Sequence, residues 1–87
     1  MSDKPFQLEI LTPLKKAFSG SVTSLIVPAA RGYLGVWANH APMVDALRPG
    51  RIILRETGGS ERTIQLLSSG VLEVRDNKAT LLADKIS

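Results

Sequence analysis

The stretch GYLGVWANHAPMVDALRPG, residues 32–50, separates the strand-like segments of this 87-residue chain. It contains the only histidine and the only tryptophan, and its only charged residues are Asp45 and Arg48. Its glycines and prolines interrupt any regular secondary-structure period, so the stretch is typical of a shaped contact surface. The segments on either side of it then indicate the fold class.

Those segments alternate between apolar and polar residues with the period of two that a half-buried strand shows. We expect strands at residues 6–10, 22–27, 51–56, 62–67, 71–75 and 78–83. Pro28 is expected to stop the second strand, and residues 57–60 and Asp76-Asn77 are expected to form hairpin turns. No window has apolar residues at helical spacing over a helix's usual length, so the sequence predicts an all-β antiparallel sandwich or barrel.

Length and composition limit the kind of protein further. A chain of 87 residues makes one domain with a thin core, and the absence of cysteine excludes disulfides, thiol catalysis and thiolate metal sites. Residues 1–5 lack the apolar run of a signal peptide, and no apolar stretch approaches the roughly 20 residues that cross a bilayer. We therefore expect a soluble protein that stays in the compartment where it is made.

Four segments carry a resemblance to a known family: FQLEILTP, AFSGSVTSLIVPAARGYLGVWANHAPMVDALRPG, SSGVLEV and LLAD. In this order they resemble the N-terminal domain of the epsilon subunit of the rotary proton-translocating ATP synthase, called delta in mitochondria. The resemblance covers essentially the whole chain. It implies an all-β fold, an antiparallel β-sandwich of two sheets with about ten short strands.

The resemblance also implies a function. It implies a non-catalytic rotor subunit, present in one copy, that joins the gamma subunit to the membrane c-ring and couples proton flow to ATP synthesis. Such a subunit is peripheral to the membrane through the c-ring, on the cytoplasmic face of the bacterial plasma membrane. No catalytic residue, cofactor, metal or nucleic-acid partner is expected.

The end of the chain departs from typical relatives. They continue beyond the Leu-Ala-Asp motif, here residues 82–84, into a C-terminal helical hairpin that in many bacteria can brake ATP hydrolysis. The sequence ends at Ser87. We therefore expect a single epsilon-type domain over residues 1–87, with the hairpin and its inhibitory function absent.

The resemblance assigns Arg31, Tyr33, Trp37 and His40 to the c-ring contact. Relatives commonly carry acidic residues near Tyr33, facing basic ring loops, so the charge pattern of this contact stays open. Each residue also has an ordinary structural interpretation: Arg31 as a solvated charge, Tyr33 and Trp37 as part of the core, and His40 as a turn residue bonded to backbone. Relatives carry Pro-Gly where this chain has Ala38-Asn39, and Asn39 can supply the left-handed conformation that glycine would supply.

The resemblance assigns Thr12, Met43, Val44 and Asp45 to the gamma-subunit contact. Apolar Met43 and Val44 fit a partner-facing edge strand, and burial between the sheets is the alternative interpretation. Three further arginines are expected to form a solvated face: Arg48, Arg51 and Arg55. We expect Glu9, Glu73 and Asp84 to be structural, because they do not pair at a spacing typical of acid and base catalysis.

Two other classes of function are alternatives to a rotor subunit. A basic β-barrel that binds single-stranded nucleic acid would need aromatic residues interleaved with Lys and Arg on adjacent strands, and the four aromatics here are not so placed. A small enzyme would need a nucleophile, a base and a stabilising group within one constellation. The sequence offers no such constellation, so both classes are disfavoured.

Overall fold

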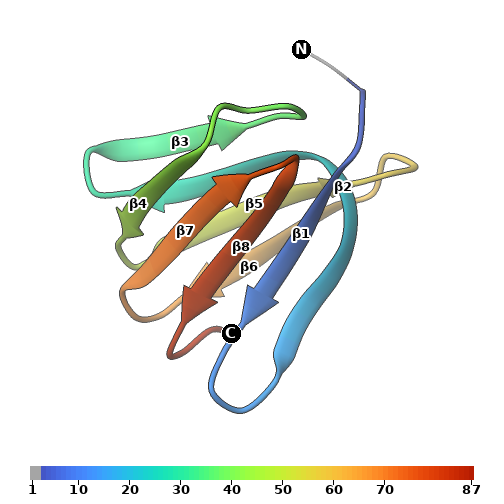
Figure 1. Ribbon diagram of the computed structural model, residues 1–87. Coiled ribbons are helices and arrows are strands. Elements are labelled where there is room, and N and C mark those ends of the chain that lie inside the picture. The colour runs from blue at the N-terminus through green and yellow to red at the C-terminus, as the bar shows by residue number, and fades with distance from the viewer. Residues whose placement is uncertain (1–2) are drawn as a thin grey trace.

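The computed structural model describes residues 3–87, which form eight β-strands and no helix (Figure 1). The strands are β1 (Phe6–Leu11), β2 (Lys16–Ala29), β3 (Gly32–Val36), β4 (Met43–Leu47), β5 (Gly50–Glu56), β6 (Glu61–Leu66), β7 (Gly70–Arg75) and β8 (Lys78–Ala83). Met1 and Ser2, with which the expected domain and N-terminal segment begin, lie outside the described residues. Residues 3–87 contain no helix of the length and hydropathy that crossing a membrane requires.

One hydrogen-bonded network joins the strands in the order β1-β8-β7-β4-β2-β5-β6, with β3 added beside β2. Strand β1 also pairs with β2, so part of the network closes on itself. Strands β1, β8, β7 and β4 form the layer at the front of Figure 1, and β5 and β6 lie behind them. Strand β2 belongs to both layers, because its first half pairs with β1 and its second half with β3 and β5.

Six of the eight strands match the segments predicted from alternation, and the all-β class is confirmed. The count of about ten strands in two purely antiparallel sheets is corrected: residues 3–87 form eight strands in one network, and the β1–β8 pair is parallel. The count is lower partly because β2 runs unbroken for 14 residues through both layers. The other two strands, β3 and β4, lie inside the stretch 32–50 that interrupted the sequence periods.

Pro28 does not end its strand, contrary to the sequence prediction. It pairs with Tyr33 inside β2, which continues to Ala29. A proline lacks only the backbone donor, and its carbonyl can still accept a hydrogen bond. Here the Pro28 carbonyl accepts the backbone N–H of Arg48 at 2.9 Å, so the position remains compatible with the sheet.

Both predicted hairpin turns are confirmed. Asp76 and Asn77 have φ values of 51° and 57°, the left-handed pair that a two-residue hairpin turn requires. Gly58 and Gly59 also have positive φ values, 105° and 104°. The two turns fix the registers of β5 with β6 and of β7 with β8.

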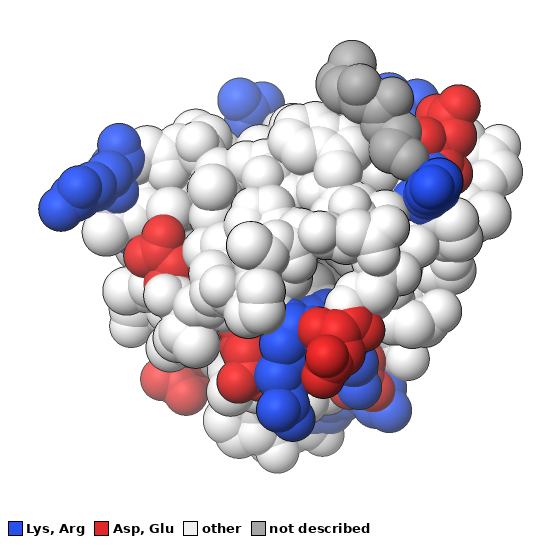
Figure 2. Space-filling view, turned by 45° about the horizontal axis from the view of Figure 1, so that its top comes forward, with Lys and Arg blue, Asp and Glu red and all other residues white. Residues whose placement is uncertain are grey.

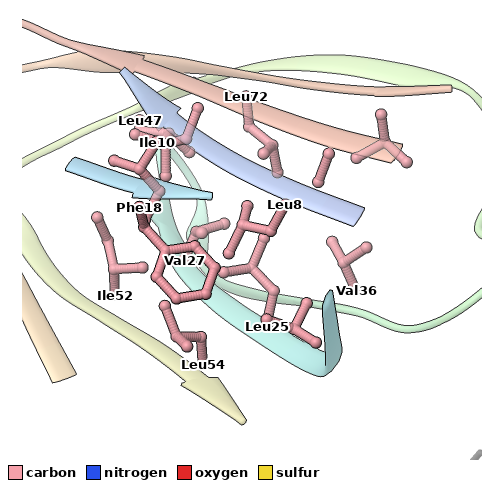
Figure 3. Close-up of a cluster of buried hydrophobic side chains, with 14 of the residues drawn as sticks. Leu8, Ile10, Phe18, Leu25, Val27, Val36, Leu47, Ile52, Leu54 and Leu72 are labelled. Carbon is pink, nitrogen blue, oxygen red and sulfur yellow. The ribbon is translucent and has the colours of Figure 1, made fainter. Parts of the chain in front are cut away.

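The core lies between the two layers and is entirely apolar among the described residues. Figure 3 shows side chains of both layers pointing toward one another, among them Leu8, Leu25, Leu54 and Leu72, all of which are fully buried. Every second residue of these strands faces inward, as the period of two predicts. The opposite faces of the two layers therefore remain available as surfaces.

Candidate partner-binding surfaces

Three residues of β3 and its exit share the outer face of one layer. Tyr33, Gly35 and Trp37 are separated by two positions each, while Leu34 and Val36 face the core. A Cβ atom on Gly35 would lie 2.5 Å from the Trp37 ring, so the indole lies against this glycine. Trp37 is half-buried on the outer face, so it is neither a core residue nor a fully exposed one.

Tyr33 lies at the other end of the same strand and is 53% exposed. Its hydroxyl accepts the backbone N–H of Arg51 at 3.2 Å. This hydrogen bond, with the nearby Arg51 and Arg48 side chains, lowers the pKa of the Tyr33 hydroxyl. The ring is thus held in place on one side and open to a partner on the other.

The loop after β3 is fixed by a side chain that the sequence marks only as a turn residue. Asn39 has a φ of 61°, which confirms the expected left-handed position. Its N–H donates to Oδ1 of Asn77 at 2.7 Å, and Nδ2 of Asn77 donates to the Pro5 carbonyl at 3.1 Å. Asn77 therefore connects the N-terminal segment, the β3–β4 loop and the β7–β8 turn, a role that spacing along the chain could not reveal.

His40 bonds to backbone, as one of its two interpretations predicts. Its N–H donates to the Trp37 carbonyl at 3.3 Å, and its ring Nδ1 lies 2.8 Å from the Ala41 carbonyl. Since a carbonyl only accepts, the Nδ1 proton is the donor of that bond. His40 is half-buried, and no group of three His, Cys, Asp or Glu side chains in residues 3–87 could hold a metal ion.

The four residues assigned to the ring contact are therefore spread along β3 and its loops. Arg31 is exposed in the turn before β3, Tyr33 and Trp37 share the outer face, and His40 lies in the loop beyond. Figure 2 shows this side of the molecule with its top turned forward, and the upper middle of the view is mostly free of charged side chains. Basic and acidic side chains gather together in the lower middle of the view, and other charged groups lie toward its edges.

Three of the four residues assigned to the gamma contact lie on β4, and they divide between its two faces. Met43 is half-buried and packs against the core, and Asp45 is half-buried on the same side of the strand. Val44 points the other way and is 68% exposed. Thr12 follows β1, and its hydroxyl lies in the turn with Lys15, donating to that residue's carbonyl at 3.2 Å.

The outer face of the front layer carries an apolar surface that the sequence assignment missed. Ala46 pairs with Val71, Val71 with Leu82, and Leu82 with Leu11, so four strands contribute to one row. Val71 and Leu82 are 42% and 50% exposed. We call these four residues, together with Val44, the apolar face. The sequence did contain a signal for it, because β7 and β8 carry apolar residues at outward as well as inward positions.

A groove of about 570 Å³ lies at one end of the apolar face. Its lining includes Leu11, Val71 and Leu82 of the row, with Thr12, Pro13 and Asp84 at the side. Thr12 is thereby adjacent to the apolar face, although it lies far from Val44 in the sequence. Tertiary structure thus connects two residues of the predicted gamma contact through residues that had not been predicted.

Comparison with protein families and with individual proteins gives consistent matches. Residues 5–87 match the family model of the ATP synthase delta/epsilon chain, beta-sandwich domain. The chain is 43% identical over 84 residues to an ATP synthase epsilon chain of Pelotomaculum thermopropionicum, covering 97% of this chain and 61% of that relative. It is also 43% identical over 86 residues to an ATP synthase epsilon chain of Chlorobaculum tepidum, covering 99% of this chain and 97% of that relative.

Solved structures show the same fold at lower identity. A chain of the Euglena gracilis mitochondrial ATP synthase, in a structure of OSCP, F1 and c-ring, superposes with a TM-score of 0.88 at 20% identity, over 95% of this chain and 52% of that one. A chain of the Tetrahymena thermophila mitochondrial ATP synthase central stalk and c-ring gives 0.80 at 18% identity, over 100% and 69%. The arrangement of the strands is therefore retained at low sequence identity.

Proposed function

The chain belongs to the delta/epsilon family as an ATP synthase epsilon chain, a non-catalytic subunit, and we propose that it joins the gamma subunit to the membrane c-ring. The match of residues 5–87 to the family's sandwich domain carries this proposal. One copy makes the joint between stalk and ring stiff, so that proton flow through the ring drives ATP synthesis in the catalytic head. The chain spans 61% of the length of one matched relative and 97% of another, and residues 5–87 supply the coupling module in either case.

In this proposal the gamma subunit binds the apolar face. Val44 and Thr12 keep their predicted role, and Val71 and Leu82 join them because they are exposed and in register between the two. Apolar side chains that stay exposed across several strands are typical of a protein–protein interface. Met43 supports the gamma contact from beneath, because it packs against the core, and Asp45 lies half-buried on the same side of β4.

The c-ring contact follows β3 from Arg31 to His40. Tyr33 and Trp37 present their rings on one outer face. Aromatic residues are enriched at protein–protein interfaces, which supports a contact there. His40 and Asn39 fix the shape of the loop at the end of that contact. The epsilon-chain relatives are bacterial, so the proposed location is the cytoplasmic face of the plasma membrane, peripheral through the c-ring.

The gamma contact can be tested by substitution on the apolar face. Val71→Asp and Leu82→Asp each place a carboxylate at a half-exposed position without opening the core. Loss of a central apolar contact should weaken binding to the gamma subunit by roughly tenfold or more. The measurement is the dissociation constant for purified gamma subunit, with circular dichroism of each variant to verify folding.

Thr63→Asp is the matched control, because Thr63 is exposed on the outer face of the other layer. It should bind gamma like the wild type. Binding that is unchanged in Val71→Asp and Leu82→Asp would place the gamma contact elsewhere. A wild-type chain that fails to co-purify with gamma would contradict the proposed function as a whole.

A further inference from the structure

Three arginines that form no ion pair with any of residues 3–87 lie at the end of the molecule where β2 turns into β3. Arg31 lies in that turn, Arg48 lies between β4 and β5, and Arg51 is the second residue of β5. All three are exposed. The four ion pairs found within residues 3–87 involve other basic residues, including the nearby Arg55, which pairs with Glu61 at 3.4 Å.

Hydrogen bonds bring the three segments together. The Arg48 N–H donates to the Pro28 carbonyl at 2.9 Å, and Nε of the same residue donates to the Ala29 carbonyl at 3.2 Å. Ala29 and Gly32 face each other across the two-residue turn that contains Arg31. Figure 2 shows positive charge at the left edge, over this turn, apart from the mixed charges at the bottom of the view.

Tyr33 completes the cluster with a hydrogen-bond donor. Its hydroxyl accepts the Arg51 N–H at 3.2 Å, and within residues 3–87 no acceptor takes the hydroxyl's own proton. The Arg51 N–H, and then the Arg51 and Arg48 side chains, lower the pKa of this hydroxyl. A phenol made more acidic in this way donates more strongly to an anionic acceptor.

We propose that Arg31, Arg48, Arg51 and Tyr33, which we call the cationic end, bind carboxylates on the polar loops of the c-ring. The proposal rests on the proposed function, which brings this end of the chain to the ring. Within residues 3–87 only Nε of the Arg48 side chain donates a hydrogen bond, to the Ala29 carbonyl, so its Nη atoms can bind a carboxylate. The cationic end thus requires acidic ring loops. Relatives with acidic residues near the position of Tyr33 would instead meet basic ring loops.

A protein carboxylate fits the cationic end better than a lipid headgroup does. Clusters that recognise anionic lipids usually contain about four to eight Lys or Arg residues, and the cationic end contains three arginines. Arginine binds a carboxylate through two parallel hydrogen bonds, which gives orientation as well as attraction. A joint that transmits torque requires such a fixed orientation.

The test uses the gamma-bound chain and vesicles that contain the purified c-ring of the same complex. The double variant Arg31→Glu, Arg51→Glu reverses two charges and keeps the Arg51 backbone N–H that bonds to Tyr33. It should bind the vesicles at least about tenfold more weakly than the wild type at low salt, with a smaller loss at high salt. Arg75→Glu is the matched control, since Arg75 is exposed at the far end of β7, and its binding should be unchanged.

Three results would overturn the proposal. Unchanged binding of the double variant would show that the cationic end does not meet the ring. Tighter binding of the double variant would show that the ring loops are basic. Equal binding of the wild type to ring-free vesicles of anionic lipid would assign the arginines to lipid. In the first two cases, retained binding to gamma and to the ring would leave the proposed function intact, so the two proposals fail separately.

Discussion

At the scale of single residues, small side chains and left-handed positions shape the surface around β3. Gly35 makes room for the Trp37 ring, and Asn39 and Asn77 connect two turns through one hydrogen bond. The first contact joins neighbours on one strand face, and the second joins turns that are distant in the sequence. Both contacts involve residues 32–50, the segment that contains the only tryptophan and the only histidine of the chain.

Gly35→Ala should displace the Trp37 indole. The added Cβ would lie 2.5 Å from the ring, and such crowding typically costs about 1–3 kcal/mol. Trp37 is the only tryptophan, so its fluorescence reports directly on the change, and the emission should shift to longer wavelength as the ring enters water. Gly20→Ala, whose Cβ would meet the Phe18 ring at 3.3 Å, is the milder control. An unchanged emission spectrum in Gly35→Ala would contradict this packing.

Asn77→Gly should release the β3–β4 loop without disturbing the β7–β8 turn. Glycine accepts the φ of 57°, while the bonds to Asn39 and Pro5 are lost, at about 1 kcal/mol each. Hydrogen exchange of the Asn39 amide, measured by NMR, should accelerate. Asn77→Asp retains an acceptor for that amide and should accelerate it much less.

The control for Asn77 is its neighbour. Asp76→Gly changes the other left-handed residue of the same turn, with φ 51°, and leaves the Asn77 side chain in place. The Asn39 amide should remain protected in this variant. Equal acceleration in Asp76→Gly and Asn77→Gly would show that the turn, rather than the side chain, protects the loop.

At the scale of elements, each strand serves the core with one face and a partner or the solvent with the other. Strand β4 illustrates this: Met43 packs inward while Val44 is exposed. The neighbouring row on the front layer is polar, with Glu9 of β1 between Lys16 of β2 and Lys78 of β8. These ion pairs connect β8 with β1 and β2, two consecutive strands that lie far from it in the sequence.

Glu9→Gln should make stability less dependent on pH. The Lys16 ammonium, and then that of Lys78, hold the pKa of the Glu9 carboxyl below its ordinary value of 4.5. Because the folded pKa is the lower one, the stabilisation is present above pH 4.5 and is lost as pH falls through the folded pKa. Urea unfolding at pH 7 should show the variant less stable than the wild type, and the difference should shrink at pH 3. A difference that is the same at both values would contradict the assignment.

At the scale of the whole molecule, two layers of short strands enclose one apolar core. A domain of this size has a thin core, so each fully buried side chain accounts for a large share of the stability. Strand β2 joins the layers, and Leu25 at its middle is fully buried.

Leu25→Ala should therefore lower the free energy of unfolding by about 2–5 kcal/mol, through lost burial and the cavity left behind. In a domain of this length each kcal/mol shifts the midpoint by about 4–8 °C, so thermal denaturation should detect the change readily. Leu82→Ala, at a position 50% exposed on the apolar face, should cost much less. Equal losses in the two variants would show that the apolar face is as important for folding as the core.

Much of the fold could be predicted from the sequence, because the period of two and the turn residues act locally. Six strands, both hairpin turns and the left-handed Asn39 follow from short segments. The strands β3 and β4 were not predicted, because glycine, proline and aromatic residues in and around them obscure the alternation of apolar and polar residues. Of the candidate surfaces, Val44 and Tyr33 are exposed as a contact requires, while Met43 takes its alternative interpretation, burial against the core.

The sequence by itself determined the all-β class and the family, since these depend on which residue types occupy which positions along the chain. Only the tertiary structure decided which distant residues share a surface. The parallel β1–β8 pair brings Leu11 beside Leu82, and the crossing of β2 between layers brings Arg31, Arg48 and Arg51 around Tyr33. Strand order and register set these neighbours, and both depend on how the whole chain buries its core.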